Sequence, residues 1–112
     1  MPSMQIDTNT FNALKESTGA DFIGELIDAF LDDAPTLIAQ MKSALTAQDA
    51  ETFRRAAHSM KSNAATFGAM ELSALAKELE FMGRDKNLDV GNRLSALEEA
   101  FRQVESQLHA LK

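Results

Sequence analysis

Residues 51–69 read ETFRRAAHSMKSNAATFGA, and the spacing of the apolar residues in this stretch decides the fold. An α-helix has about 3.6 residues per turn, so side chains that recur every three or four positions share one face. The side chains that recur in this way are those of Phe53, Ala57, Met60, Ala64 and Phe67. Asp49 can cap the first turn, and Gly68 fits the helix end, where a left-handed backbone favours glycine. The stretch is therefore predicted to form one amphipathic helix.

The chain before this helix is predicted to hold a short helix and a long one. Asp7 or Thr8 can cap the short helix, which should end at Gly19. The long helix begins near Asp21, and its apolar stripe comprises Leu26, Phe30, Leu37, Met41 and Leu45. Pro35 lies inside this stripe. Because proline removes a backbone donor and crowds the preceding turn, it either kinks one helix or begins a second one, and we favour a kinked continuous helix.

Two further helices are predicted after residue 69. The first carries Leu72, Leu75, Leu79 and Met82 and ends at Gly83. After a loop within residues 83–91, the second carries Leu94, Leu97, Phe101, Val104, Leu108 and Leu111. No segment alternates apolar and polar residues for long enough to indicate a strand. Four amphipathic helices with short connections bury their stripes only against one another. We therefore expect an all-α protein, an up-down-up-down four-helix bundle with a short extra N-terminal helix, forming a single domain over residues 1–112.

Composition excludes several classes of function. The 112 residues carry a formal net charge of −6, which argues against nucleic acid as a partner because that binding depends on cationic contacts to phosphates. The chain has no cysteine, so neither a disulfide framework nor a thiolate zinc site can form. The longest apolar run is too short to span a membrane, and the N-terminus lacks a signal pattern. We expect a cytoplasmic protein without membrane contact.

His58 is predicted to point away from the core, because its direction on the helix lies about 140° from the axis of the apolar face. An exposed histidine is most often a surface residue without a role, but two features argue otherwise here. Residues 51–62 hold three Lys or Arg residues against one Glu, a cationic spot in an acidic protein that suits a phosphoryl group. Ser62 and Ala65 are small, so a partner can approach the ring closely. A neutral imidazole keeps one ring nitrogen free as a nucleophile.

Residues 56–80, AAHSMKSNAATFGAMELSALAKELE, resemble the signature of histidine phosphotransfer (HPt) domains. That signature is roughly Ala-His-x-Leu-Lys-Gly-Ser-Ala-x-x-x-Gly-Ala, followed by a leucine-rich helix that ends in Leu-Glu. His58 and Lys61 match it, as do the residue pairs 68–69 and 79–80, and Met60 stands where leucine is usual. Residues 30–58, FLDDAPTLIAQMKSALTAQDAETFRRAAH, also resemble the family. Ser62 and Asn63 depart from the usual glycine and serine, and these departures leave partner choice and transfer rate open.

The resemblance implies a phosphorelay intermediate built as a four-helix bundle. His58 would accept a phosphoryl group from a receiver-domain aspartate and pass it to another receiver. Lys61 would neutralise phosphoryl charge, Ser62 would be the small position near the ring, and Arg54 would add electrostatic support. The partners would be receiver domains of response regulators and of hybrid sensor kinases. Magnesium would belong to the receiver, so we expect no cofactor or metal on this chain, no kinase activity of its own, and a monomer.

Three alternatives compete with this interpretation. A histidine kinase dimerisation domain usually has an acid after its histidine and a proline a few residues on, whereas Ser59 follows His58 and no proline follows Pro35. An enzyme with His58 as general base needs an orienting carboxylate and a concave pocket, and the helix neighbours Arg54 and Lys61 supply neither. A helical adaptor that binds receivers or other partners without phosphoryl transfer stays open.

The receiver would need a partly apolar docking surface around the ring, drawn from the His58 helix and the helix before it. The candidates that we consider for this surface are Ile23, Ile27, Ala34 and Ile38, wherever they lie off the core stripe.

Overall fold

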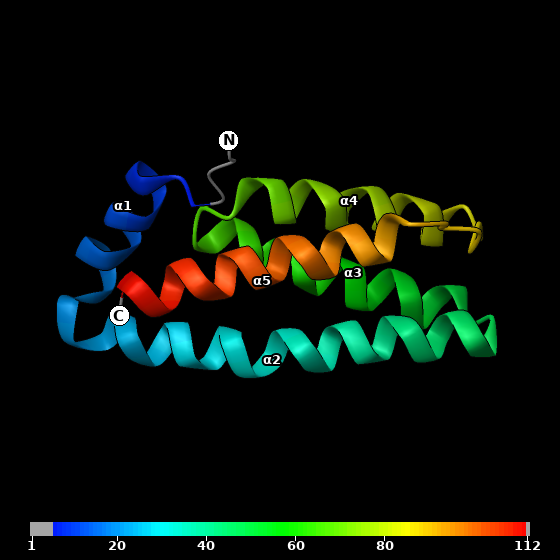
Figure 1. The fold of residues 1–112 in the computed structure, drawn as a ribbon, viewed down its shortest axis with the longest axis horizontal. Helices are drawn as coiled ribbons and strands as arrows, with labels where there is room; N and C mark the ends of the chain where they lie inside the picture. Colours follow the sequence, from blue (N-terminus) through cyan, green and yellow to red (C-terminus); the bar gives the residue numbers. More distant parts are fainter. Residues whose placement is uncertain (1–5, 112) are drawn as a thin grey trace.

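The computed structural model describes residues 6–111, which form five α-helices and no strand element. The helices are α1 (Thr8–Thr18), α2 (Ala20–Ala47), α3 (Ala50–Thr66), α4 (Met70–Arg84) and α5 (Arg93–Leu111). The helices α2 to α5 run up and down beside one another, and α1 lies across the end of the bundle where α5 finishes (Figure 1). This arrangement confirms the predicted all-α bundle with a short extra N-terminal helix.

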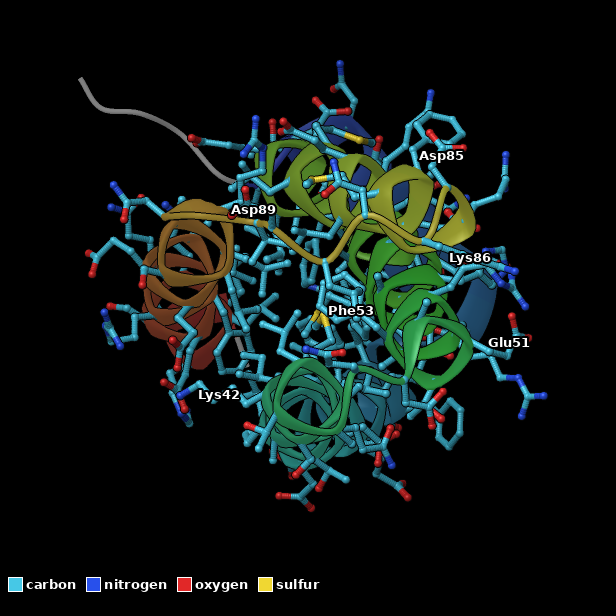
Figure 2. All side chains as sticks on the ribbon, turned by 90° about the vertical axis from the view of Figure 1, so that its right-hand side faces the viewer. Lys42, Glu51, Phe53, Asp85, Lys86 and Asp89 are labelled. Carbon is cyan, nitrogen blue, oxygen red and sulfur yellow. The ribbon has the colours of Figure 1, made fainter. Side chains whose placement is uncertain are left out.

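The core fills the space between the four long helices. Figure 2 looks along the bundle and shows Phe53 pointing into its interior, whereas Lys42, Glu51 and Lys86 point outward. All five apolar side chains predicted for the α3 face are buried. The side chain of Asp49 accepts a hydrogen bond from the backbone N–H of Thr52, as expected of a cap. None of the helices among residues 6–111 is long and apolar enough to cross a membrane.

The helix α2 continues through Pro35, so the continuous-helix interpretation is confirmed. Its buried face differs from the predicted stripe. Phe30 and Met41 are buried, but Leu26, Leu37 and Leu45 are only partly buried. The other buried residues of α2 are Ile23, Ile27, Ala34, Ile38 and Ala44.

This result overturns the four docking candidates. Ile23, Ile27, Ala34 and Ile38 are between 0% and 7% exposed, so they pack in the core and no partner can reach them. The physical reason is that the isoleucines and alanine complete a stripe with a mean spacing near 3.6 residues, and the leucines at positions 26 and 37 lie at its edge.

Helix α4 ends at Arg84, one residue beyond the predicted end at Gly83. Gly83 serves a different purpose, which is close packing against α3. A Cβ atom at Gly83 would lie 3.1 Å from the N, Cα and Cβ atoms of Arg54, tighter than ordinary van der Waals contact. Glycine thus lets the two helix backbones approach one another one turn away from His58.

The turn between α3 and α4 is held by the segment that leads into α1. The backbone N–H of Asp7 donates to the carbonyl of Gly68 at 2.7 Å, and Ile6 forms a β-bridge with Ala69. Gly68 has a φ of +84°, as predicted for a left-handed helix end, and a Cβ there would lie 2.8 Å from the carbonyl oxygen of Asp7. The N-terminal segment therefore fixes where α4 begins.

Candidate functional site

His58 lies in the middle of α3, and 52% of its side chain is exposed. Its neighbours Ala57 and Met60 are fully buried. The prediction that His58 points away from the core is therefore confirmed. One side of the helix is therefore packed in the core, and the imidazole is accessible on the other side.

A buried carboxylate from α4 holds the ring. Oε2 of Glu80 lies 2.8 Å from Nδ1 of His58, and only 3% of the Glu80 side chain is exposed. The other carboxylate oxygen, Oε1, lies 2.7 Å from Nζ of Lys61, and Nη2 of Arg84 lies 3.6 Å from Oε2. The hydroxyl of Ser73 adds a further tie between the helices, donating to the carbonyl of Lys61 at 3.0 Å.

Glu80 stays ionised in this environment. Burial alone would raise its pKa, but the ammonium of Lys61 beside Oε1 and the contact of His58 with Oε2 outweigh burial and hold the pKa of Glu80 below its usual value. An ionised carboxylate only accepts hydrogen bonds. The contact with His58 therefore requires the proton on Nδ1, and in a neutral ring Nε2 then carries the lone pair.

The arginines before His58 are engaged with an exposed acid. Arg54 donates to Glu51 through Nε at 3.0 Å and Nη2 at 2.7 Å, and Arg55 donates to the same carboxylate at 3.0 Å. Hydrogen bonds from Arg54 and then Arg55 lower the pKa of Glu51 to about 2. Both arginines lie within one helical turn of His58, and both form ion pairs with Glu51.

The structure brings Arg54, His58, Lys61 and Ser62 together along one side of α3, as their spacing predicts. Ser62 is exposed, and Lys61 is partly buried because its ammonium reaches Glu80. Within residues 6–111, no group of three or more His, Cys, Asp or Glu side chains comes together as a metal site.

The sequence interpretation missed the role of Glu80. It counted Glu80 only as part of the family pattern and placed no carboxylate beside the ring, whereas the structure supplies one. The sequence did contain one indication that Glu80 is buried and needs a partner. Glu80 lies among the buried residues Ala76, Leu79 and Gly83 at helical spacing, so an acid occupies a position on the buried face of α4. Such an acid requires cationic or hydrogen-bonding partners from a neighbouring helix.

Comparisons with known proteins give matches at the levels of sequence family and structure. The family model described as "Hpt domain" matches residues 25–112, which include His58 and Glu80. The fold is similar to the crystal structure of histidine-containing phosphotransfer protein B (HptB) from Pseudomonas aeruginosa PAO1. The TM-score is 0.91 at 27% sequence identity, and the alignment covers 97% of this chain and 95% of that one. No curated protein sequence matches the chain.

Proposed function

Because the chain belongs to the HPt domain family, we propose that it receives a phosphoryl group on His58 from a receiver-domain aspartate and passes it to another receiver. The observation that carries the proposal is the contact between Nδ1 of His58 and the ionised Glu80. This contact occupies Nδ1 and orients the ring, so that Nε2, the nitrogen with the lone pair, is available to react with a partner. The protein is then a phosphoryl carrier in a phosphorelay and needs no kinase activity.

In the proposed step, the Nε2 lone pair attacks the phosphorus of the aspartyl phosphate. An N–P bond forms while the bond from phosphorus to the aspartyl oxygen breaks, and the aspartate leaves as a carboxylate with the electron pair. The phosphorylated ring, still protonated at Nδ1, carries positive charge. Glu80 faces that proton, so its negative charge stabilises the charged ring during attack. Transfer onward reverses these bond changes on a second receiver.

Lys61 is proposed to offset the charge of the phosphoryl group. Its Nζ lies 2.7 Å from Glu80, and 28% of its side chain is exposed, so Lys61 lies one turn from His58 and is partly accessible to a partner. Arg54 is proposed to add a more distant positive charge while paired with Glu51. Ser62, exposed and small, leaves space beside the ring for the receiver.

The proposed partners are receiver domains of response regulators and of hybrid sensor kinases, which this chain would meet as a monomer. Any magnesium ion in the reaction would be held by the receiver, since this chain contributes only His58 and its neighbours. The competing proposal is a helical adaptor that binds receivers without accepting the phosphoryl group.

The test is label transfer from phosphorylated receiver domains to the native chain, to His58→Gln and to His109→Gln. His109, an exposed residue of α5, is the other histidine and serves as the matched control. We expect label that is stable in base and lost in acid on the native chain and on His109→Gln, and none on His58→Gln. If no receiver labels a native chain that circular dichroism shows to be folded, the adaptor replaces this proposal.

A further inference from the structure

The outer edge of α4, next to Glu80, carries two exposed apolar and two cationic side chains. Met70, Lys77, Phe81 and Arg84 are spaced by seven, four and three residues, so they lie within about 60° of one another around the helix. We refer to these four residues as the α4 edge. Met70 is 47% and Phe81 is 44% exposed, and they are two of the four large hydrophobic residues most exposed among residues 6–111.

Contacts join the α4 edge to the phosphoryl site. The guanidinium carbon of Arg84 lies 5.0 Å and Nζ of Lys77 lies 5.8 Å from the centre of the Phe81 ring, so the ring is flanked by two cations. Arg84 also reaches Oε2 of Glu80, the oxygen that holds His58. The aromatic ring is thus held at the surface beside the site instead of being folded into the core.

Charge indicates what kind of surface would cover this region. The site and the α4 edge together hold five cationic residues, Arg54, Arg55, Lys61, Lys77 and Arg84, against Glu51 and Glu80. These seven residues carry a net charge of +3, whereas the whole chain carries −6. A partner that brings an aspartyl phosphate to His58 presents negative charge here, and opposite charges steer and orient such encounters.

We infer that the α4 edge is a docking flank for the receiver domain, an inference that rests on the proposed function. Phe81 would pack against an apolar side chain of the receiver, and Lys77 and Arg84 would pair with acidic groups around its phosphorylated aspartate. Aromatic and arginine side chains are the residues that most often dominate binding at protein interfaces. The α4 edge would then set receiver affinity, whereas His58 and Glu80 set the rate of the bond-making step.

The test measures transfer rate against receiver concentration for Phe81→Ala and Lys77→Glu. Matched controls are Phe22→Ala, on α2 with 46% exposure, and Lys15→Glu, an exposed lysine of α1. We expect Phe81→Ala to raise the half-saturating receiver concentration about tenfold and to leave the maximal transfer rate within about twofold. Lys77→Glu should also raise the half-saturating receiver concentration, and more strongly at low salt than at high salt.

Two results would overturn the inference. One is an unchanged half-saturating concentration for both α4 variants, and the other is an equal loss in the Phe22 and Lys15 controls. A binding measurement in the His58→Gln background keeps this result separate from the proposed function. If the native chain accepts no label but binds receivers, and Phe81→Ala weakens that binding, the transfer proposal fails and the docking flank stands. If binding is unaffected by Phe81→Ala, the docking flank fails whether or not transfer occurs.

Discussion

Nδ1 of His58, on a half-exposed imidazole of α3, lies 2.8 Å from Oε2 of Glu80, a carboxylate of α4 that is almost wholly buried. A buried carboxylate is costly unless its charge is compensated, and an apolar residue of similar volume often stabilises a core equally well. Lys61 supplies the compensation at 2.7 Å. Stability alone therefore gives little reason for an acid at this position, whereas orientation of the imidazole gives a clear one.

Replacing Glu80 with glutamine separates orientation from charge. The amide oxygen of glutamine can still accept a hydrogen bond from Nδ1–H, but it lacks the negative charge that stabilises a positively charged ring. We expect Glu80→Gln to slow phosphoryl transfer by about tenfold or more. The control is Glu78→Gln, an exposed acid of the same helix that pairs with Arg93, and its transfer rate should be unchanged. Single-turnover transfer from one receiver measures both variants, and equal rates for Glu80→Gln and the native chain would remove Glu80 from the mechanism.

The lowered pKa of Glu80 predicts how its contribution to stability depends on pH. Burial opposes ionisation, but Lys61 and His58 more than compensate, so the folded-state pKa lies below the unfolded-state value. The folded state then binds fewer protons than the unfolded state between the two values, and the contribution is present above the unfolded-state pKa. It is lost as pH falls through the folded-state pKa.

Urea unfolding of the native chain and of Glu80→Gln across the acid range measures this effect. The difference in free energy of unfolding between the two should change in favour of the variant as pH falls below about 4.3, the ordinary range of a glutamate side chain. Using the difference removes the contribution of Glu51, whose lowered pKa is common to both proteins. A difference that is constant with pH would show that Glu80 is not held ionised by Lys61 and His58.

Periodicity along the chain predicts much of this architecture because it depends on one helix at a time. The spacing of Phe53, Ala57 and Met60 fixes which face of α3 is buried, and the exposed position of His58 follows from the same angle. The caps at Asp49 and Gly68 are also local, so both were predictable. The fold class and the presentation of the imidazole could therefore be derived before the structure.

The partner of His58 could not be derived in this way. Which residue of α4 meets the ring depends on the rotation and separation of two helices, and neither is recorded in the pattern of α3 alone. The close packing of Gly83 against Arg54, one turn from His58, likewise joins residues of two different helices. The same limitation explains the wrong docking candidates on α2, where apolar residues on the two edges of one stripe cannot be ranked without the neighbouring helices.

A substitution at Ile38 tests whether the docking candidates on α2 are core residues. A docking role for Ile38 requires an exposed side chain, at which glutamate would slow transfer without unfolding the bundle. Because Ile38 is only 7% exposed, the introduced carboxylate would be buried without a partner, and we expect the free energy of unfolding to fall by about 3 kcal/mol or more. Ala39→Glu, at the exposed neighbouring position of α2, should change it by less than about 0.5 kcal/mol. Chemical denaturation measures the free energy of unfolding of both variants. An Ile38→Glu chain as stable as Ala39→Glu would show that Ile38 is exposed and not part of the core.

Gly83 packs closely against Arg54, one helical turn from His58, so alanine at this position should disturb both stability and transfer. The added Cβ would lie 3.1 Å from backbone and side-chain atoms of Arg54, so these atoms and the added methyl group must separate by a few tenths of an ångström. We expect Gly83→Ala to lower the free energy of unfolding by about 1–3 kcal/mol, the usual cost of overpacking, and to lengthen the contact between His58 and Glu80. Transfer should slow as that contact weakens.

Gly24 provides the matched comparison for this change, because it also lies inside a helix but its added Cβ would meet nothing within 4 Å. Gly24→Ala should stabilise the protein by about 0.5–1 kcal/mol through helix propensity and leave transfer unchanged. Thermal and urea unfolding give the two free energies, and the nitrogen chemical shifts of the His58 ring report whether Nδ1 keeps its proton. If Gly83→Ala is stabilised like Gly24→Ala and keeps the same ring tautomer and transfer rate, the close approach of α3 and α4 does not position the imidazole.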